Sequence, residues 1–164
     1  MAMASKEIDV IDLVLRDHRD PDTKERMGIL KEMMLVLDRD DVWTKIEPVL
    51  EFLNIHVTKH FKNEEIMIVL MLRDNKLTDV ETHVIHEIIE EHKEILGYFN
   101  ELIAIAKNYN PSDRTLKEKF VEATHNIFEK LLLHAKKEDE VLYPAARKYM
   151  TAQKLADLKV CITK

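Results

Sequence analysis

Histidine and glutamate occur four residues apart at two separate places in the chain. His60 is followed by Glu64, and His134 is followed by Glu138. Four residues turn an α-helix through about 400°, so the side chains of each pair leave the same helix face, roughly 6 Å apart along the axis. A carboxylate and an imidazole that face an apolar interior are strongly destabilising unless they pair with each other or bind a metal ion.

The residues around both pairs are apolar, which indicates that the two faces point inward. The apolar neighbours are Leu53, Val57, Met67 and Met71 for the first pair and Ile127, Leu131, Val141 and Leu142 for the second. Di-metal carboxylate bundles use comparable pairs, because each glutamate can bridge two ions while each histidine binds one. The alternative is that each pair is a buried histidine–carboxylate hydrogen bond without metal. Taken together, the two pairs favour a shared metal site.

Further residues are candidates to complete this site. His92 lies on the apolar face of another predicted helix, and His18 ends the apolar stripe of the first predicted helix. Three weaker candidates are His56, one turn before His60, His86, on the polar side of the helix that carries His92, and Asp139, as a substitute for Glu138. The sequence therefore supplies enough nitrogen and oxygen donors for more than one metal ion.

Charge balance suits a pair of iron ions. Two ferrous ions carry four positive charges, of which two carboxylates and a bridging hydroxide would offset three. Neutral imidazoles fill the remaining positions, and such a site releases protons when it is loaded. This donor set leaves a coordination position open, where a small ligand such as dioxygen would bind. Zinc and manganese also accept histidine and glutamate, so the identity of the metal stays open.

Long amphipathic helices joined by short links are predicted to carry these residues. Only two glycines and four prolines occur in 164 residues, and helix-forming residues dominate. The periodicity predicts helices over about 6–19, 21–38, 42–73, 78–109 and 112–144, and a short helix after residue 151. Whether the first two pieces form one kinked helix or two separate helices stays open. Thr78 and Glu81 have capping-box spacing. We therefore expect an all-α fold, an up-and-down four-helix bundle with a short extra C-terminal helix, formed by one domain over residues 1–164.

The overall composition excludes some classes of function. The formal net charge of −6 argues against general nucleic-acid binding, which needs a basic face. The N-terminus lacks the apolar core of a signal peptide, and the longest uncharged apolar run, 66–72, is far shorter than the roughly 20 residues of a membrane helix. The single cysteine, Cys161, cannot form an internal disulfide. We therefore expect a cytoplasmic protein that binds neither nucleic acid nor membranes, and its oligomeric state stays open.

Three segments of the chain resemble the motifs of a known family, and together with His18 they span most of the sequence. Residues 53–67, LNIHVTKHFKNEEIM, are similar to the second-helix signature of hemerythrins. Residues 91–95, EHKEI, resemble the third-helix signature of the same family. Residues 134–144, HAKKEDEVLYP, resemble the closing motif of the HHE cation-binding branch.

The resemblance implies a four-helix bundle with an oxygen-bridged di-iron site, in which Glu64 and Glu138 bridge the two irons. It also implies one histidine ligand from the first helix, which by position is His18. Oxygen-carrying hemerythrins have a further histidine where this chain has Ile88, and their fourth-helix carboxylate is an aspartate at the place of Asp139. These differences argue against simple reversible oxygen carriage and leave the fifth histidine ligand open.

The resulting expectation is a non-haem di-iron protein that binds or senses dioxygen, nitric oxide or peroxide, or that handles iron. One alternative is a di-iron enzyme, either a peroxidase-like detoxifier or a repair protein for iron–sulfur clusters, and another is an interaction module with a structural metal. Repair proteins of this kind usually carry an additional N-terminal domain with a cysteine motif, and here no cysteine precedes Cys161. We therefore favour binding or sensing over catalysis.

Overall fold

Helices make up the regular secondary structure of the residues that the structure describes, which are 10–16, 21–73, 75–110 and 112–162, and no strand occurs among them. In this computed structural model the elements are α1 (Val10–Arg16), α2 (Pro21–Met34), α3 (Asp40–Leu72), α4 (Asp79–Lys107), α5 (Arg114–Lys137), the π-helical segment η2 (Glu138–Leu142), α6 (Tyr143–Tyr149) and α7 (Ala152–Ile162). The all-α prediction is confirmed. The predicted helix over 6–19 is observed as α1, and its other residues lie outside the described ranges.

Side-chain caps fix where two of the long helices begin. Thr78 and Glu81 form the predicted capping box at α4, in which each side chain accepts a hydrogen bond from the backbone N–H of the other. At α5 the Asp113 carboxylate accepts from the backbone N–H of Thr115 at 3.0 Å. Both caps satisfy backbone donors that have no partner inside the helix.

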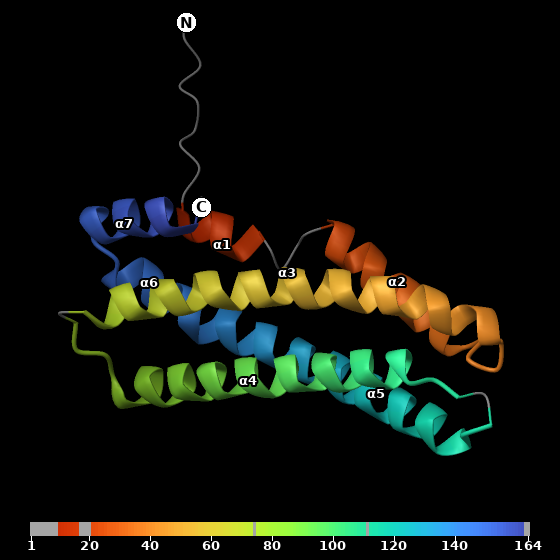
Figure 1. The fold of residues 1–164 in the computed structure, drawn as a ribbon. Coiled ribbons are helices and arrows are strands. Elements are labelled where there is room, and N and C mark those ends of the chain that lie inside the picture. Colours follow the sequence, from red (N-terminus) through yellow and green to blue (C-terminus); the bar gives the residue numbers. More distant parts are fainter. Residues whose placement is uncertain (1–9, 17–20, 74, 111, 163–164) are drawn as a thin grey trace, which may run out of the picture.

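The four longer helices pack side by side in chain order. Helix α2 packs on α3, α3 on α4 and α4 on α5, and Figure 1 shows α3, α4 and α5 running in alternating directions. Helices α6 and α7 lie at one end, where both contact α1 and α3. No described helix combines the length and the apolar character that crossing a lipid bilayer requires.

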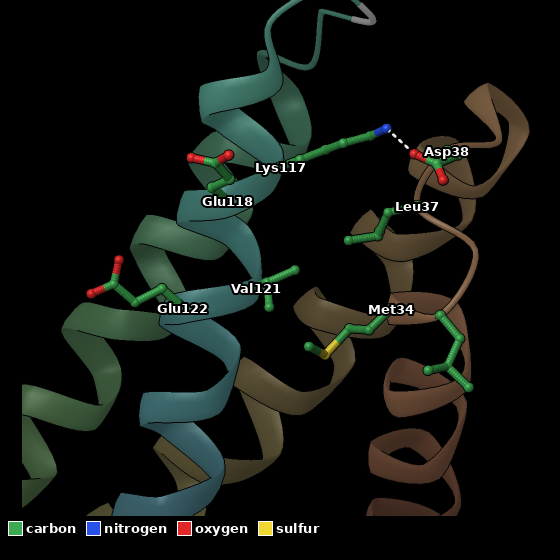
Figure 2. Close-up of a pocket in the computed structure, with 8 residues that line it drawn as sticks. Met34, Leu37, Asp38, Lys117, Glu118, Val121 and Glu122 are labelled. Carbon is green, nitrogen blue, oxygen red and sulfur yellow. Dashed lines mark hydrogen bonds and ion pairs between the residues drawn. The ribbon is translucent and has the colours of Figure 1, made fainter.

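An ion pair joins the corner between α2 and α3 to the beginning of α5. Lys117 of α5 donates a hydrogen bond to the Asp38 carboxylate, which holds the pKa of Asp38 below its ordinary value. Beside this pair, Met34, Leu37 and Val121 line a cavity of about 430 Å³ (Figure 2). This cavity lies where α5 begins, away from the candidate ligands near the end of that helix.

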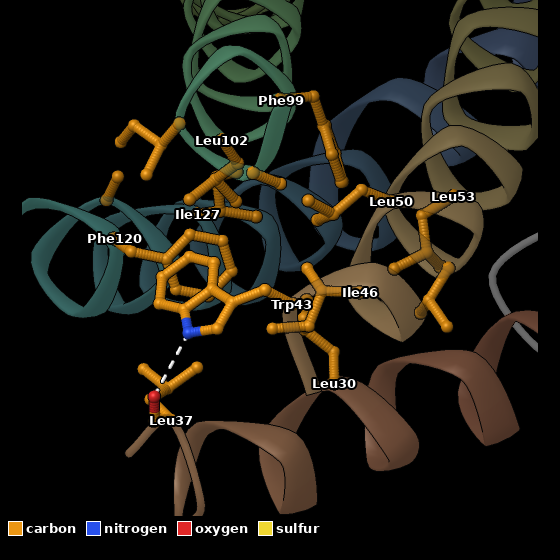
Figure 3. Packing of buried hydrophobic residues seen from close by; sticks show 14 of the residues in the cluster. Leu30, Leu37, Trp43, Ile46, Leu50, Leu53, Phe99, Leu102, Phe120 and Ile127 are labelled. Carbon is orange, nitrogen blue, oxygen red and sulfur yellow. Dashed lines mark hydrogen bonds between the residues drawn. The ribbon is translucent and has the colours of Figure 1, made fainter. Parts of the chain in front are cut away.

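Two clusters of buried apolar side chains fill the interior. The first cluster joins α2, α3, α4 and α5 and includes Trp43, Leu50 and Phe99 (Figure 3). Trp43 stacks on Tyr109 with 4.1 Å between the ring centroids, and its Nε1–H donates to the carbonyl oxygen of Leu37 at 3.0 Å. The indole therefore has both an apolar contact and a partner for its only polar group.

The second cluster lies at the opposite end and joins α1, α3, α4, α6 and α7 through residues such as Val14, Met71 and Leu158. The candidate ligands lie between the two clusters along three helices: Glu64 between Phe61 and Met67, His92 between Ile88 and Ile95, and His134 between Ile127 and Leu142. Apolar packing on both sides therefore fixes the helices that carry these ligands.

The last long helical stretch ends later than the sequence predicted. We predicted an end near residue 144, but the helical backbone continues through η2 and α6 to Tyr149. Pro144 does not interrupt it, because Pro144 lies in the first turn of α6, where proline is tolerated. Helix α7 is the predicted short C-terminal helix.

Candidate metal site

Four buried side chains from neighbouring helices converge between the two clusters. They are Glu64 of α3, His92 of α4, His134 of α5 and Glu138 of η2, and each offers one nitrogen or oxygen within 4.8 Å of the corresponding atoms of the others. Both glutamates are 0% exposed, and the histidines are 1% and 2% exposed. The fold therefore gathers side chains that the sequence places in three separate helical stretches.

The Nε2 atom of His92 lies between the two glutamates. It is 3.7 Å from Glu64 Oε1 and 3.5 Å from Glu138 Oε1. His134 Nε2 contacts the same oxygen of Glu138, and His60 Nε2 lies 3.0 Å from Glu64 Oε1. Both His-x-x-x-Glu pairs are therefore buried, and His92 contacts the glutamate of each.

The chemistry of these atoms fits a metal ion. Although the distances above suit ion pairs, Glu64 Oε1, His92 Nε2 and His134 Nε2 are buried and form no hydrogen bond within the described part of the chain. A buried polar atom without a partner costs about 1–3 kcal/mol, and coordination to a cation would remove that cost. Imidazole nitrogen and carboxylate oxygen together suit iron, zinc and manganese. The residues present therefore fit the kind of site that the sequence predicted.

Two further carboxylates bind the outer ring nitrogens of the buried histidines. Glu65 Oε1 lies 3.0 Å from His92 Nδ1, and Glu91 Oε2 lies 2.8 Å from His134 Nδ1. A carboxylate only accepts hydrogen bonds, so each Nδ1 carries the hydrogen in the neutral ring. Each Nε2 is then left with a free lone pair directed at the cluster, which is the form that binds a metal.

Lys137 keeps Glu91 ionised. Its ammonium group donates to Glu91 Oε1 and lies 3.3 Å from Glu87 Oε2. Burial on its own would raise the pKa of Glu91, but the hydrogen bonds from Lys137 and His134 outweigh it and lower this pKa below its ordinary value. Glu91 therefore remains a hydrogen-bond acceptor for His134 across the neutral pH range.

Glu64 and His134 favour protonation in the metal-free protein. Burial, together with the charge of Glu138, raises the pKa of Glu64 despite the nearby His60. Burial would lower the pKa of His134, but Glu138 and Glu91 outweigh it and raise this pKa above its ordinary value. The cluster thus holds protons that a bound cation would displace.

A tyrosine beyond the helix end hydrogen-bonds to the cluster. The Tyr143 hydroxyl donates to Glu64 Oε2 at 2.8 Å. In an uninterrupted α-helix, Tyr143 would point about 140° away from Glu138, because five residues turn through about 500°. Here the backbone N–H of Tyr143 bonds to the carbonyl oxygen of Glu138, a π-helical i to i+5 bond that places the two residues above one another. Both side chains are therefore directed into the same interior.

An aromatic ring covers the imidazoles on one side. Phe61 stacks on His92 with 3.9 Å between the ring centroids and 10° between the planes. Phe61 also contacts His134 edge-on, with 5.3 Å between the ring centroids. Phe61 thus limits both the ring rotation of the histidines and the access of water to them.

The weaker candidates lie outside this cluster. His56 is exposed and packs on Phe52 with 4.2 Å between the ring centroids, while His86 and Asp139 are exposed on α4 and η2. His18 lies outside the described residues, so the structure says nothing of its position. Ile88, one turn before His92, is fully buried in the second apolar cluster.

Three residues of the site were not predicted from the sequence. Glu65, Glu91 and Tyr143 contact the cluster, although each belongs to a motif that was singled out for other residues. A usable signal was available for the first two: a buried metal-binding histidine needs an acceptor for its second nitrogen, and both are glutamates directly beside a predicted ligand. No sequence pattern indicated the role of Tyr143, because it depends on the π-helical turn.

Comparison with known proteins agrees with this geometry. A family model described as the hemerythrin HHE cation binding domain matches residues 9–146. No curated protein and no solved structure matches the chain. The matched range contains every residue of the buried cluster and the histidine at position 18.

Proposed function

The chain belongs to the hemerythrin HHE cation-binding family, and on this premise we propose that it is a non-haem di-iron protein that binds or senses a small oxidant. The observation that supports this most directly is the group of buried nitrogen and oxygen atoms of Glu64, His92 and His134 that have no hydrogen-bond partner among the described residues. When bound, an iron pair would supply reversible electron transfer and an open position for dioxygen, nitric oxide or peroxide.

We assign the metal-binding role to five described residues and to one outside the described ranges. The described ones are His60, Glu64, His92, His134 and Glu138, and the sixth is His18. In the proposed arrangement α2 to α5 form an up-and-down four-helix bundle, within one domain over residues 1–164. The two glutamates, which lie within 3.7 Å of His92 Nε2, would hold the metal together with the imidazoles.

The surrounding residues prepare the site before any metal binds. Glu65 and Glu91 hold the imidazoles in the tautomer that presents Nε2 inward. Tyr143 keeps its proton, because burial and the charge of Glu64 raise its pKa far above the ordinary value, and so it fixes the orientation of Glu64 as a donor. Phe61 and the two apolar clusters exclude water. These features favour binding and sensing over a catalytic role.

Metal analysis of anaerobically purified protein, together with its optical spectrum before and after exposure to air, tests the proposed function. We expect a pair of iron ions per chain and new visible absorbance after air. His92→Ala should remove most of the iron, because it deletes the nitrogen that lies between both glutamates. His83→Ala is the matched control on the same helix, since His83 is exposed and pairs with Glu87, away from the cluster. Equal iron in both variants would refute the site.

The role of His18 stays a prediction that iron content can test. The helices before and after it, α1 and α2, contribute Val14 and Thr23 to the wall of a pocket that also includes His60. Replacing His18 with alanine should therefore lower the bound iron from a pair to a single ion per chain, with the helical circular-dichroism signal retained. Unchanged iron would remove His18 from the site.

Glu91→Gln should weaken iron binding by about 10- to 100-fold, which is the usual effect of removing the acceptor that orients a metal-binding histidine. Glutamine is nearly the same size but loses the charge that Lys137 and His134 share. Competition with a chelator of known affinity measures the change. Glu90→Gln is the control, because the Glu90 carboxylate is exposed and pairs with Lys93. Equal affinities of the two variants would contradict the positioning role.

A further inference from the structure

A pocket of about 950 Å³ lies directly beside the candidate metal site. Its walls come from α1, α2, α3, α5 and the end of α7, and they include His60, Phe61 and His134. The same residues, His60, Phe61 and His134, therefore line the pocket on one side and contact the cluster on the other. A molecule in the pocket would contact the histidines and Phe61 without having to bind a metal.

The pocket is much larger than a small oxidant needs. A water molecule takes up about 30 Å³ of the liquid, and dioxygen or nitric oxide is of comparable size. Pockets of about 300–1,000 Å³ are typical for organic ligands of drug-like size. Its walls are largely apolar, through residues such as Val14, Met27, Phe128 and Leu131. The volume and the lining together indicate an organic ligand with a long apolar part.

The charges on the pocket lining are opposite in sign to those of the whole chain. Lys24, Lys31 and Lys59 line the pocket, against one acidic residue, Glu129. The chain carries a formal net charge of −6, so a local excess of lysines stands out from the rest of the surface. Lys31 lies 4.9 Å above the ring of Phe128, which joins a cationic group to the apolar wall. A ligand that matches this lining has an anionic head and an apolar tail.

We propose that this pocket binds an amphipathic organic carboxylate, with the tail along the apolar wall and the carboxylate at the lysines. The free acid is the intended ligand, and not a membrane surface, because the pocket is enclosed by helices on several sides. A bound tail would lie over His60 and Phe61, on the pocket side of the candidate metal site. This inference does not require the proposed metal to be present.

Isothermal titration calorimetry with dodecanoate, below its micelle concentration, tests the proposal on metal-free and on iron-loaded protein. We expect saturable binding to both forms at one site per chain. Dodecanol, which has the same tail without the charge, should bind at least about tenfold more weakly. The double variant Lys24→Glu, Lys59→Glu should also lose about tenfold or more, because two attractions become repulsions.

A control variant and phospholipid vesicles test whether the binding is specific to this pocket and to the free acid. Lys136→Glu is the control, since Lys136 is exposed on α5 and is not part of the pocket lining; it should bind dodecanoate as the unmodified protein does. Absence of binding, equal binding of dodecanol, or binding only to anionic phospholipid vesicles would each overturn the proposal. The iron content of the same samples is measured separately, so a protein that binds dodecanoate but no iron would refute the proposed function and leave this inference standing.

Discussion

Leucine in place of both Glu64 and Glu138 should raise the melting temperature of the metal-free protein and abolish its response to iron. Both carboxylates are 0% exposed, and in the metal-free state they contact the imidazoles of His60, His92 and His134. Replacing a buried ion pair with well-packed apolar residues of similar volume is often stabilising by about 1–4 kcal/mol. The same range is expected here because His92 and His134 can stay neutral and keep their hydrogen bonds to Glu65 and Glu91 when the two carboxylates are removed. At this chain length that corresponds to a rise of roughly 3–15 °C. Differential scanning calorimetry in the presence of a chelator measures it.

The same experiment with ferrous iron separates a metal site from a merely polar core. Ligand at about 1,000 times its dissociation constant adds about 4 kcal/mol of stability, so iron should raise the melting temperature of the unmodified protein by roughly 8–16 °C. The leucine variant should show no such rise. In the leucine variant the Tyr143 hydroxyl would lose its acceptor, Glu64. The same variant therefore also carries Tyr143→Phe, which removes this hydroxyl. A control with leucine at the exposed Glu94 and Glu140 should respond to iron normally, and an iron response in the first variant would contradict the assignment.

The metal-free protein should lose stability as the pH rises from about 5 to 8. Burial raises the pKa of Glu64 above its ordinary value of 4.5, and Glu138 and Glu91 raise that of His134 above 6.5 against the effect of burial. In this range the folded state therefore binds more protons than the unfolded state, so the free energy of unfolding falls as the pH rises through the folded-state pKa values. The pKa of Glu91 is lowered, so Glu91 makes the free energy of unfolding rise with pH, but only below a pH of about 4.5.

Urea unfolding at a series of pH values, with iron removed, measures this dependence. Glu64→Gln should flatten it, because the amide cannot titrate, while His125→Gln on the exposed face of α5 should leave it unchanged. Iron affinity should show the opposite trend and strengthen with pH, since the ligands must release protons to bind. Stability that rises with pH in the metal-free protein would show that these groups are not protonated in the folded state.

The two histidine–glutamate pairs of the candidate site could be predicted because they depend only on helical periodicity. His60 and Glu64 share a face at any α-helical geometry, and the same holds for His134 and Glu138. The supporting carboxylates could not be derived in this way. Glu65 reaches His92 across 27 residues of sequence, and Glu91 reaches His134 across 43, so both contacts depend on how neighbouring helices pack.

Proline was a misleading signal for the end of the last long helix. In isolation Pro144 predicts a break, because proline lacks an N–H and clashes with the preceding turn. The chain avoids both effects by changing to π-helical bonding over Glu138–Leu142 and restarting an α-helix at Tyr143. Leu142 and Tyr143 are both buried after this change. A search for the regular 3.6-residue period of an α-helix does not include a turn with a different period.

The π-helical turn also makes the chain sensitive to length at this point. A turn of this kind corresponds to one residue inserted into an otherwise regular α-helix. Deleting Asp139 or Glu140, both exposed, would place Tyr143 four residues after Glu138, where regular α-helical bonding keeps both side chains on one face. A further inserted residue has no such compensation, and it would rotate Tyr143 and Ala146 by about 100° away from the interior, although neither was altered. Between the candidate metal site and α6, an insertion is therefore more disruptive than a deletion.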